Sequence, residues 1–253
     1  MTRRLLIAGS VLAALVLGWK LANGDFLLLG VIGAFAAMLV AHWLTDLAPD
    51  LFFGGIILFG YLVGNRGFAQ LQMPGLPLLP AEAVLGLGVF ICCWRAARSK
   101  RLPIRRDALN FAILAWIAVG LARLPYDVRL HGFLAVRDFA SVYYAVFFFL
   151  AQEWSTLPRA RAWLFGWLTA GLALTTPIFA AFTHWPWVFL SFTVAGVPPI
   201  YVKSDVAGGF MAAGVFWFGW RFLQDRLWLW LGLTALCTAG VVFCNSRASM
   251  LAL

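Results

Sequence analysis

Three arginines border or interrupt apolar stretches of the chain, and their side chains are the first candidates for chemistry. Arg247 stands in Cys-Asn-Ser-Arg-Ala-Ser between two apolar runs, Arg137 precedes an apolar run, and Arg66 lies in a stretch rich in glycine and proline. A guanidinium group stays charged in a low-dielectric environment and binds phosphate through two parallel hydrogen bonds. Arg247 is therefore a candidate anion ligand to which free backbone amides at the helix junction could add, and Arg137 and Arg66 are further candidates.

Each arginine also has a structural interpretation, which the sequence leaves open. Arg247 could be a side chain that extends to the membrane interface, Arg137 could form a local ion pair with Asp138, and Arg66 could lie on the surface of a turn. An arginine inside a membrane is costly unless it faces a wet cavity or a partner. The functional interpretation therefore depends on which other residues reach the same side of the membrane.

Two histidines, His131 and His184, are the candidate general bases. Both are expected in loops, where a lone histidine is commonly only solvated. The sequence has no zinc-protease, Walker-type or nucleophile-elbow motif. Asp46 and Asp50 flank Pro49 and are predicted to lie in a solvated turn rather than to hold Mg²⁺ against a diphosphate. We therefore predict that the chain uses no metal and no cofactor.

The composition is that of an integral membrane protein. The 253 residues are 63% hydrophobic and 11% charged, against about 45–50% and about 25% in soluble domains. The alternating strands of an outer-membrane barrel are absent from the sequence, so the predicted fold is an all-α, polytopic membrane helix bundle. The net charge of +9 comes from short loops and does not indicate nucleic-acid binding. The four cysteines lie within apolar runs and form neither a disulfide framework nor a zinc motif.

Nine apolar runs are predicted to cross a bilayer, which takes about 20 residues, or fewer with polar flanks. They cover residues 5–19, 26–44, 51–63, 81–94, 108–122, 139–151, 162–182, 206–222 and 227–244, and a tenth starts near Ala248. Runs 51–63 and 81–94 are short and rich in glycine, so they could instead form one re-entrant pair. No repeat or linker divides the chain, and residues 1–253 are predicted to form one membrane domain.

The basic residues in the loops set the predicted orientation, because cytoplasmic loops are enriched in lysine and arginine. With a cytoplasmic N-terminus, twelve of the 19 basic residues lie inside and seven lie outside. If runs 51–63 and 81–94 formed a re-entrant pair, the basic residues up to residue 106 would no longer fit this cytoplasmic enrichment. Nine to ten spans are therefore favoured. The outside loops of interest cover residues 64–80, 124–137 and 183–205. The outside set is Lys20, Arg66, Arg123, Arg129, Arg137, Lys203 and Arg247.

Residues 241–253, V-V-F-C-N-S-R-A-S-M-L-A-L, resemble the Ser-Arg-small-small-apolar segment that opens the core of the O-antigen ligase and O-antigen polymerase superfamily. Three upstream segments resemble that family in the same order. They are G-N-R-G-F followed by P-G-L-P-L-L-P-A-E, then V-R-D-F-A-S-V-Y-Y, and then S-D-V-A-G-G-F-M-A-A-G. Under this resemblance, residues 237–253 are the start of the family's core segment.

The resemblance implies a metal-independent enzyme of the bacterial inner membrane. Such enzymes transfer a glycan from an undecaprenyl-diphosphate carrier to a lipid or glycan acceptor on the periplasmic face. Arg247, and by extension Arg137 and Arg66, would bind the diphosphate. The family's base comes from a later periplasmic loop, so we expect it beyond Leu253, with His131 and His184 as weaker candidates. The chain stops within the tenth span, so we expect a truncated protein that is inactive alone.

Two other classes remain open on the sequence. One is a transporter or flippase for a lipid-linked anion, which would use the same arginines without chemistry. Transporters commonly show interrupted helices in matching halves of the chain, and only residues 183–205 hint at such an interruption. The other is a non-catalytic membrane protein in which the arginines mark the interface.

The predicted orientation is tested by single cysteines placed in a chain whose four native cysteines are replaced by alanine. Cysteines at Gly75 and Pro198 should react with a membrane-impermeant thiol reagent added to spheroplasts, because both positions are expected outside. A cysteine at Ser99 should be protected, because the loop after Trp94 is expected in the cytoplasm. Labelling at Ser99, with protection at the other two positions, would invert the topology.

Overall fold

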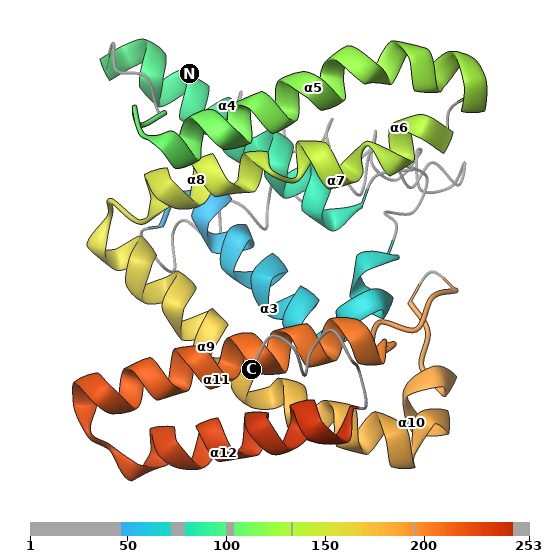
Figure 1. The fold of residues 1–253 in the computed structure, drawn as a ribbon, viewed down its shortest axis with the longest axis vertical. Coiled ribbons are helices and arrows are strands. Elements are labelled where there is room, and N and C mark those ends of the chain that lie inside the picture. The colour runs from blue at the N-terminus through green and yellow to red at the C-terminus, as the bar shows by residue number, and fades with distance from the viewer. Residues whose placement is uncertain (1–46, 72–78, 100–103, 133, 195, 245–253) are drawn as a thin grey trace, which may run out of the picture.

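The computed structural model describes residues 47–71, 79–99, 104–132, 134–194 and 196–244, and these segments are helical (Figure 1). Turns, irregular connections and two isolated β-bridges make up the rest of them. The helices are α3 (Pro49–Ala69), α4 (Pro80–Ser99), α5 (Ala108–His131), α6 (Leu134–Asp138), α7 (Ala140–Tyr143), α8 (Val146–Trp154), α9 (Pro158–His184), α10 (Pro186–Ser191), α11 (Ser204–Asp225) and α12 (Trp228–Phe243).

Five of these helices are long and apolar enough to cross a membrane: α3, α4, α5, α9 and α11. They contain the predicted spans 51–63, 81–94, 108–122, 162–182 and 206–222. The predicted span 227–244 corresponds to the shorter apolar helix α12. The expected spans 5–19 and 26–44, and the start of the tenth, lie outside the described residues.

The predicted span 139–151 is not one helix. Its residues form α7 and α8, separated by Tyr144 and Ala145, and α6 precedes them. The Ala145 and Phe148 backbone N–H groups donate to carbonyls three residues earlier, so the chain tightens there without leaving the helical direction.

The sequence prediction of a loop over residues 124–137 is wrong. Helix α5 continues through Pro125 to His131 and stops at Gly132, which has a φ of +63° and donates its N–H to the Val128 carbonyl at 2.9 Å. Glycine adopts a positive φ without a steric penalty, so it marks the end of the helix better than the proline does. The start of α5 is fixed by Asp107, whose carboxylate accepts the Asn110 backbone N–H at 2.8 Å.

The helices run between two opposite ends of the molecule. The ends of α3, α5 and α9 and the starts of α4, α6 and α11 lie toward the right of Figure 1, and their other ends lie toward the left. We call these the outer and inner ends, following the predicted topology. The arrangement agrees with the alternation of loops that the sequence predicts.

Helix α3 lies at the centre of the packing. At its inner half, Leu51 packs with Leu85 of α4, Leu150 and Trp154 of α8, and Ala160 of α9. At its outer half, a second cluster joins α3 to α9, α11 and α12, and comprises Leu62, Leu172, Phe218 and Cys237. Each half of α3 therefore packs against a different set of helices, and α9 belongs to both sets.

Asp50, predicted to lie in a solvated turn, is in fact buried, with 1% of its surface exposed. The Trp154 indole N–H donates to its Oδ2 at 2.8 Å, and an Arg95 guanidinium nitrogen lies 3.8 Å from its Oδ1. The carboxylate lies in the first turn of α3, where the helix dipole favours a negative charge. One buried carboxylate thus ties the inner ends of α3, α4 and α8 together.

Large apolar side chains cover the outside of the described bundle. On α5, Phe111, Trp116 and Val119 are more than half exposed, and so are Trp228 and Phe243 of α12. Such continuous apolar surface is unstable in water and is normal for a helix that faces lipid. The described fold is thus that of a multi-pass membrane protein.

Close approach of α3 and α9 depends on Gly171. A Cβ atom there would lie 2.6 Å from the Leu62 Cδ1 atom, whereas a Cβ at Gly166, one and a half turns earlier, would meet nothing within 4 Å. We expect Gly171→Ala to destabilise the fold by about 1–3 kcal/mol through overpacking. The matched control Gly166→Ala should leave the midpoint of thermal unfolding in detergent unchanged or raised. Equal midpoints for the two variants would show that α3 and α9 do not pack this closely.

Candidate anion-binding site

Helix α3 is interrupted at Asn65, near its outer end. Asn65 has a φ of +53° and a ψ of −126°, which no helical residue adopts, although residues on both sides are helical. A positive φ is uncommon outside glycine, and a helix break inside an apolar segment frees backbone groups that need partners. The break is therefore the feature around which a polar site can form.

The connection between α10 and α11 supplies those partners. The Gly67 N–H donates to the Tyr201 carbonyl and the Tyr201 N–H donates to the Gly64 carbonyl, both at 3.2 Å. A Cβ at Gly64 would lie 2.6 Å from the Pro199 carbonyl oxygen, so glycine is needed for this close backbone contact. The predicted loop over 64–80 thus begins later than expected, since residues 66–69 are helical and dock against this connection.

The Asn65 side chain joins the two segments. Its Oδ1 accepts the Arg66 N–H at 2.7 Å and the Lys203 N–H at 3.3 Å. Only 3% of Asn65 is exposed, and its Nδ2 has no hydrogen-bond partner among the described residues. A buried amide that donates to nothing is costly, so a ligand with an acceptor atom would satisfy it.

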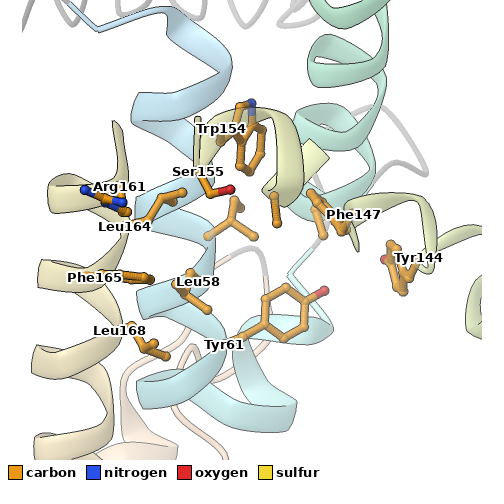
Figure 2. A pocket seen from close by; sticks show the side chains of 14 residues that line it. Leu58, Tyr61, Tyr144, Phe147, Trp154, Ser155, Arg161, Leu164, Phe165 and Leu168 are labelled. Carbon is orange, nitrogen blue, oxygen red and sulfur yellow. The ribbon is translucent and has the colours of Figure 1, made fainter. Parts of the chain in front are cut away.

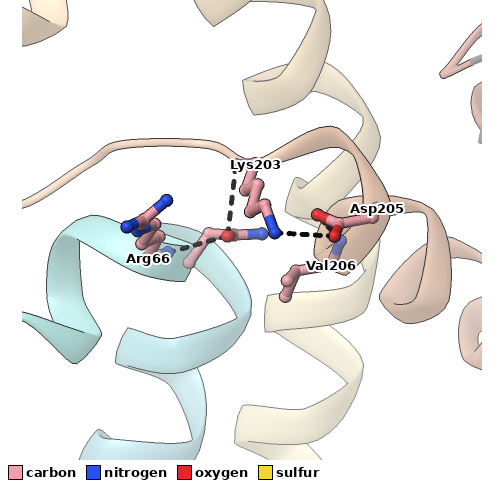
Figure 3. A network of polar contacts seen from close by, with 5 residues as sticks. Arg66, Lys203, Asp205 and Val206 are labelled. Carbon is pink, nitrogen blue, oxygen red and sulfur yellow. Dashed lines mark hydrogen bonds and ion pairs between the residues drawn. The ribbon is translucent and has the colours of Figure 1, made fainter.

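This amide lies beside a cavity that is also lined by two cationic side chains. The cavity has a volume of about 360 Å³ and is lined by Tyr61, Asn65, Arg66, Ala69, Lys203, Val206 and Phe210. Arg66 comes from α3 and Lys203 from the residue before α11, and Figure 3 shows the Lys203 side chain directed toward Asp205. Two cations and an unused amide donor make this a candidate anion-binding site, which we call the outer junction.

One carboxylate reduces the positive charge of the outer junction. The Lys203 Nζ lies 2.8 Å from the Asp205 Oδ2, and both side chains are about half exposed. None of the described residues pairs with the Arg66 guanidinium. Arg66 is therefore the stronger anion ligand, while Lys203 is held in place by Asp205 at the first turn of α11.

The outer junction suits a phosphate-containing anion better than a metal. Its donors are a guanidinium, an ammonium and an amide, which bind oxyanions and repel cations. Within the described segments, no group of three His, Cys, Asp or Glu side chains is placed to hold a metal ion.

The three predicted anion ligands fall in different places. Arg66 belongs to the outer junction. Arg137 lies in α6, which begins at the outer end in Figure 1. Arg247 lies outside the described residues, so its proposed part in the site stays a prediction.

The two candidate bases are not in the outer junction. His131 is the last residue of α5, not a loop residue, and lines a separate cavity of about 400 Å³ together with Asp127 and Asp138. His184 ends α9, and its Nδ1 lies 2.9 Å from the Ala180 carbonyl, to which it donates. His131 therefore has carboxylates nearby that the sequence did not reveal, whereas His184 faces its own helix.

Sequence reasoning missed Asn65 as a site residue and placed Lys203 only among the basic residues of the outside loops. An available signal was the asparagine between two glycines in Gly-Asn-Arg-Gly at the end of an apolar run. Asparagine tolerates a positive φ better than most residues, and glycines on both sides permit close backbone contact. Lys203, whose backbone N–H donates to Asn65 from 138 positions later, has no comparable signal in the sequence.

Comparison with known proteins adds no assignment. No protein-family model matches the chain, and neither a curated protein nor a solved structure is significantly similar to it. The site must therefore be interpreted from its own residues.

The Asn65→Asp substitution tests the anion site, because it keeps the Oδ1 acceptor and replaces the unused donor by an oxygen. Inorganic diphosphate titrated into the detergent-purified chain should bind about tenfold or more weakly to this variant by calorimetry, since hydrogen bonds to charged groups are worth about 1.5–3 kcal/mol. The control Gln70→Glu adds the same charge at the end of α3, outside the cavity lining. It should bind diphosphate nearly as well as the unmodified chain. Equal affinity in both variants would remove Asn65 from the site.

Proposed function

We propose that this chain is part of a glycosyltransferase of the bacterial inner membrane, similar to O-antigen ligases and polymerases. It transfers a glycan from an undecaprenyl-diphosphate carrier to a lipid or glycan acceptor on the periplasmic face. The observation that carries the proposal is the outer junction, where Arg66, Lys203 and the buried Asn65 amide line one cavity. The motif resemblance at Arg247 supplies the reaction class.

A lipid diphosphate matches this cavity in both polarity and location. Its charged group needs several donors, which Arg66, Lys203 and Asn65 provide, while Val206 and Phe210 offer an apolar wall for the adjoining chain. The cavity volume falls within the range of about 300–1,000 Å³ typical of ligand sites. An amphipathic ligand at the outer end of membrane helices also stays in contact with the bilayer.

The chemical role of these donors is to stabilise the leaving group. When the bond between the sugar and the diphosphate breaks, the carrier takes both bonding electrons and gains negative charge. Donors that are already fixed around that group favour the transition state over the bound substrate. Arg66 is assigned this role together with Arg247, and Arg137 is assigned a supporting one. The reaction requires no metal in this scheme.

His131 is the candidate base for deprotonating the acceptor hydroxyl, because Asp127 and Asp138 line the same cavity. The N-terminus is assigned to the cytoplasm, which places the outer junction on the periplasmic side.

A second function is favoured by the same helix break. Transporters place ion and substrate sites where a membrane helix is interrupted, and α3 is interrupted at Asn65 beside two cations. A flippase for a lipid-linked anion would therefore move the ligand across the membrane without cleaving it. The two functions differ in whether the bond between glycan and diphosphate is broken.

We expect Arg66→Ala to lower glycan transfer by the full-length protein by about 10²-fold, the usual effect of losing one donor to a developing negative charge. Arg247→Lys should be nearly as harmful as Arg247→Ala, since an ammonium cannot bind bidentately. Arg137→Ala should be milder, because its sequence neighbour Asp138 is expected to share its charge. The assay measures glycan transferred by detergent-purified protein from a lipid-diphosphate donor to an acceptor.

The matched control is Arg129→Ala, an exposed arginine on the same predicted side that lies outside the outer junction. It should retain normal transfer. Full activity of Arg66→Ala and Arg247→Ala at equal protein level would reduce both arginines to interfacial side chains. Movement of intact lipid-linked glycan across proteoliposomes, without transfer, would establish the flippase instead.

A further inference from the structure

A third and larger cavity lies between α3, α8 and α9, away from the cationic side chains of the outer junction. Its volume is about 470 Å³, and Figure 2 shows its lining residues, among them Leu58, Phe147, Leu164 and Phe165. Tyr61 borders both this cavity and the outer junction. A cavity of this size with apolar walls accommodates a hydrocarbon chain.

One end of this cavity carries a charge. Arg161, in the first turn of α9, is the only charged residue among those that line the cavity, and Ser155 lies near it (Figure 2). Arg161 is exposed, and its guanidinium pairs with none of the described residues. The nearby buried carboxylate of Asp50 is already bound by Trp154 and lies beside Arg95. Arg161 is therefore available to a ligand.

We propose that this cavity binds an anionic phospholipid. The lipid phosphate lies against Arg161 at the inner end, and one acyl chain extends between α3, α8 and α9 toward Tyr61. The charge of Arg161 selects the headgroup, and the apolar walls hold the chain without selecting its identity. The site is separate from the donors proposed to bind the carrier diphosphate.

The position of Arg161 favours a lipid over a protein segment as the occupant. Arg161 lies in the first turn of α9, a helix long enough to cross the membrane, at the end predicted to face the cytoplasm. Anionic lipids of the cytoplasmic leaflet are attracted by such basic residues, with about 1 kcal/mol per arginine, and basic pockets between membrane helices bind their headgroups. A phospholipid provides an anion for Arg161 joined to an acyl chain that can enter the apolar part of the cavity.

A bound chain would also contribute to the fold. Side chains of both α8 and α9 line the cavity, and Gly54 of α3 lies at its wall. An empty apolar space leaves its lining without contacts on one side. An acyl chain would restore these contacts and connect the three helices at the level of the bilayer.

The test is native mass spectrometry of the detergent-purified chain with equimolar phosphatidylglycerol and phosphatidylcholine that carry the same acyl chains. The unmodified chain should bind phosphatidylglycerol preferentially. Arg161→Gln should lower that preference by about fivefold, which corresponds to the loss of one basic residue near the headgroup. Arg161→Lys should keep most of it, because attraction to a monophosphate needs the charge more than the guanidinium shape.

The matched control is Arg221→Gln, a basic residue at the same end that pairs with Asp225 and does not line the cavity. It should keep the full preference. Ala151→Phe fills the cavity and should weaken binding of both lipids, with an unchanged circular-dichroism spectrum as the check of folding. Unchanged preference in Arg161→Gln, or unchanged binding in Ala151→Phe, would overturn the proposal. Equal binding of the two lipids by the unmodified chain would also overturn the proposal, since it would show that the cavity binds acyl chains without recognising the headgroup.

Discussion

A broken membrane helix must find partners for its backbone, because lipid offers none. In α3 the break lies at Asn65, and the partners come from residues 199–203, far along the chain. This requirement fixes the connection between α10 and α11 against the end of α3. It thereby places Lys203 beside Arg66, and the start of α11 beside both. The polar outer junction follows from the need to satisfy a few backbone groups.

The described bundle has a buried polar residue at each end of α3, with apolar packing between them. Asp50 is bound by Trp154 and approached by Arg95 at the inner end, while Asn65 joins the backbone of Lys203 at the outer end. They differ in one respect. The Asp50 charge has partners from two neighbouring helices, although its Oδ1 makes no hydrogen bond, so it serves the fold, whereas the unused donor of the Asn65 amide lies beside a cavity. An unused buried donor is the better indicator of a ligand.

The sequence predicted the apolar interior well and the polar contacts poorly. The apolar runs correctly located five predicted spans, which lie within α3, α4, α5, α9 and α11, because a helix that crosses lipid needs such a run. Proline was a poor guide to helix ends, since Pro125 and Pro177 both lie inside helices. The burial of Asp50 and the pairing of Asn65 with Lys203 depend on tertiary contacts more than 100 positions apart, which periodicity does not encode. Arg66 was identified only because arginine beside an apolar run is costly.

The break at Asn65 also explains why Arg66 can bind a ligand at all. In an unbroken helix, residues four apart lie on one face, so Arg66 would follow Leu58 and Leu62. That face packs against α9 and α11, where Leu62 joins Leu172 and Phe218 in the core. A guanidinium there would be buried among apolar side chains without a partner, at a high cost. The positive φ at Asn65 turns the chain before Arg66, which is exposed as a result. The same helix thus packs its apolar residues against α9 and directs its arginine into the outer junction.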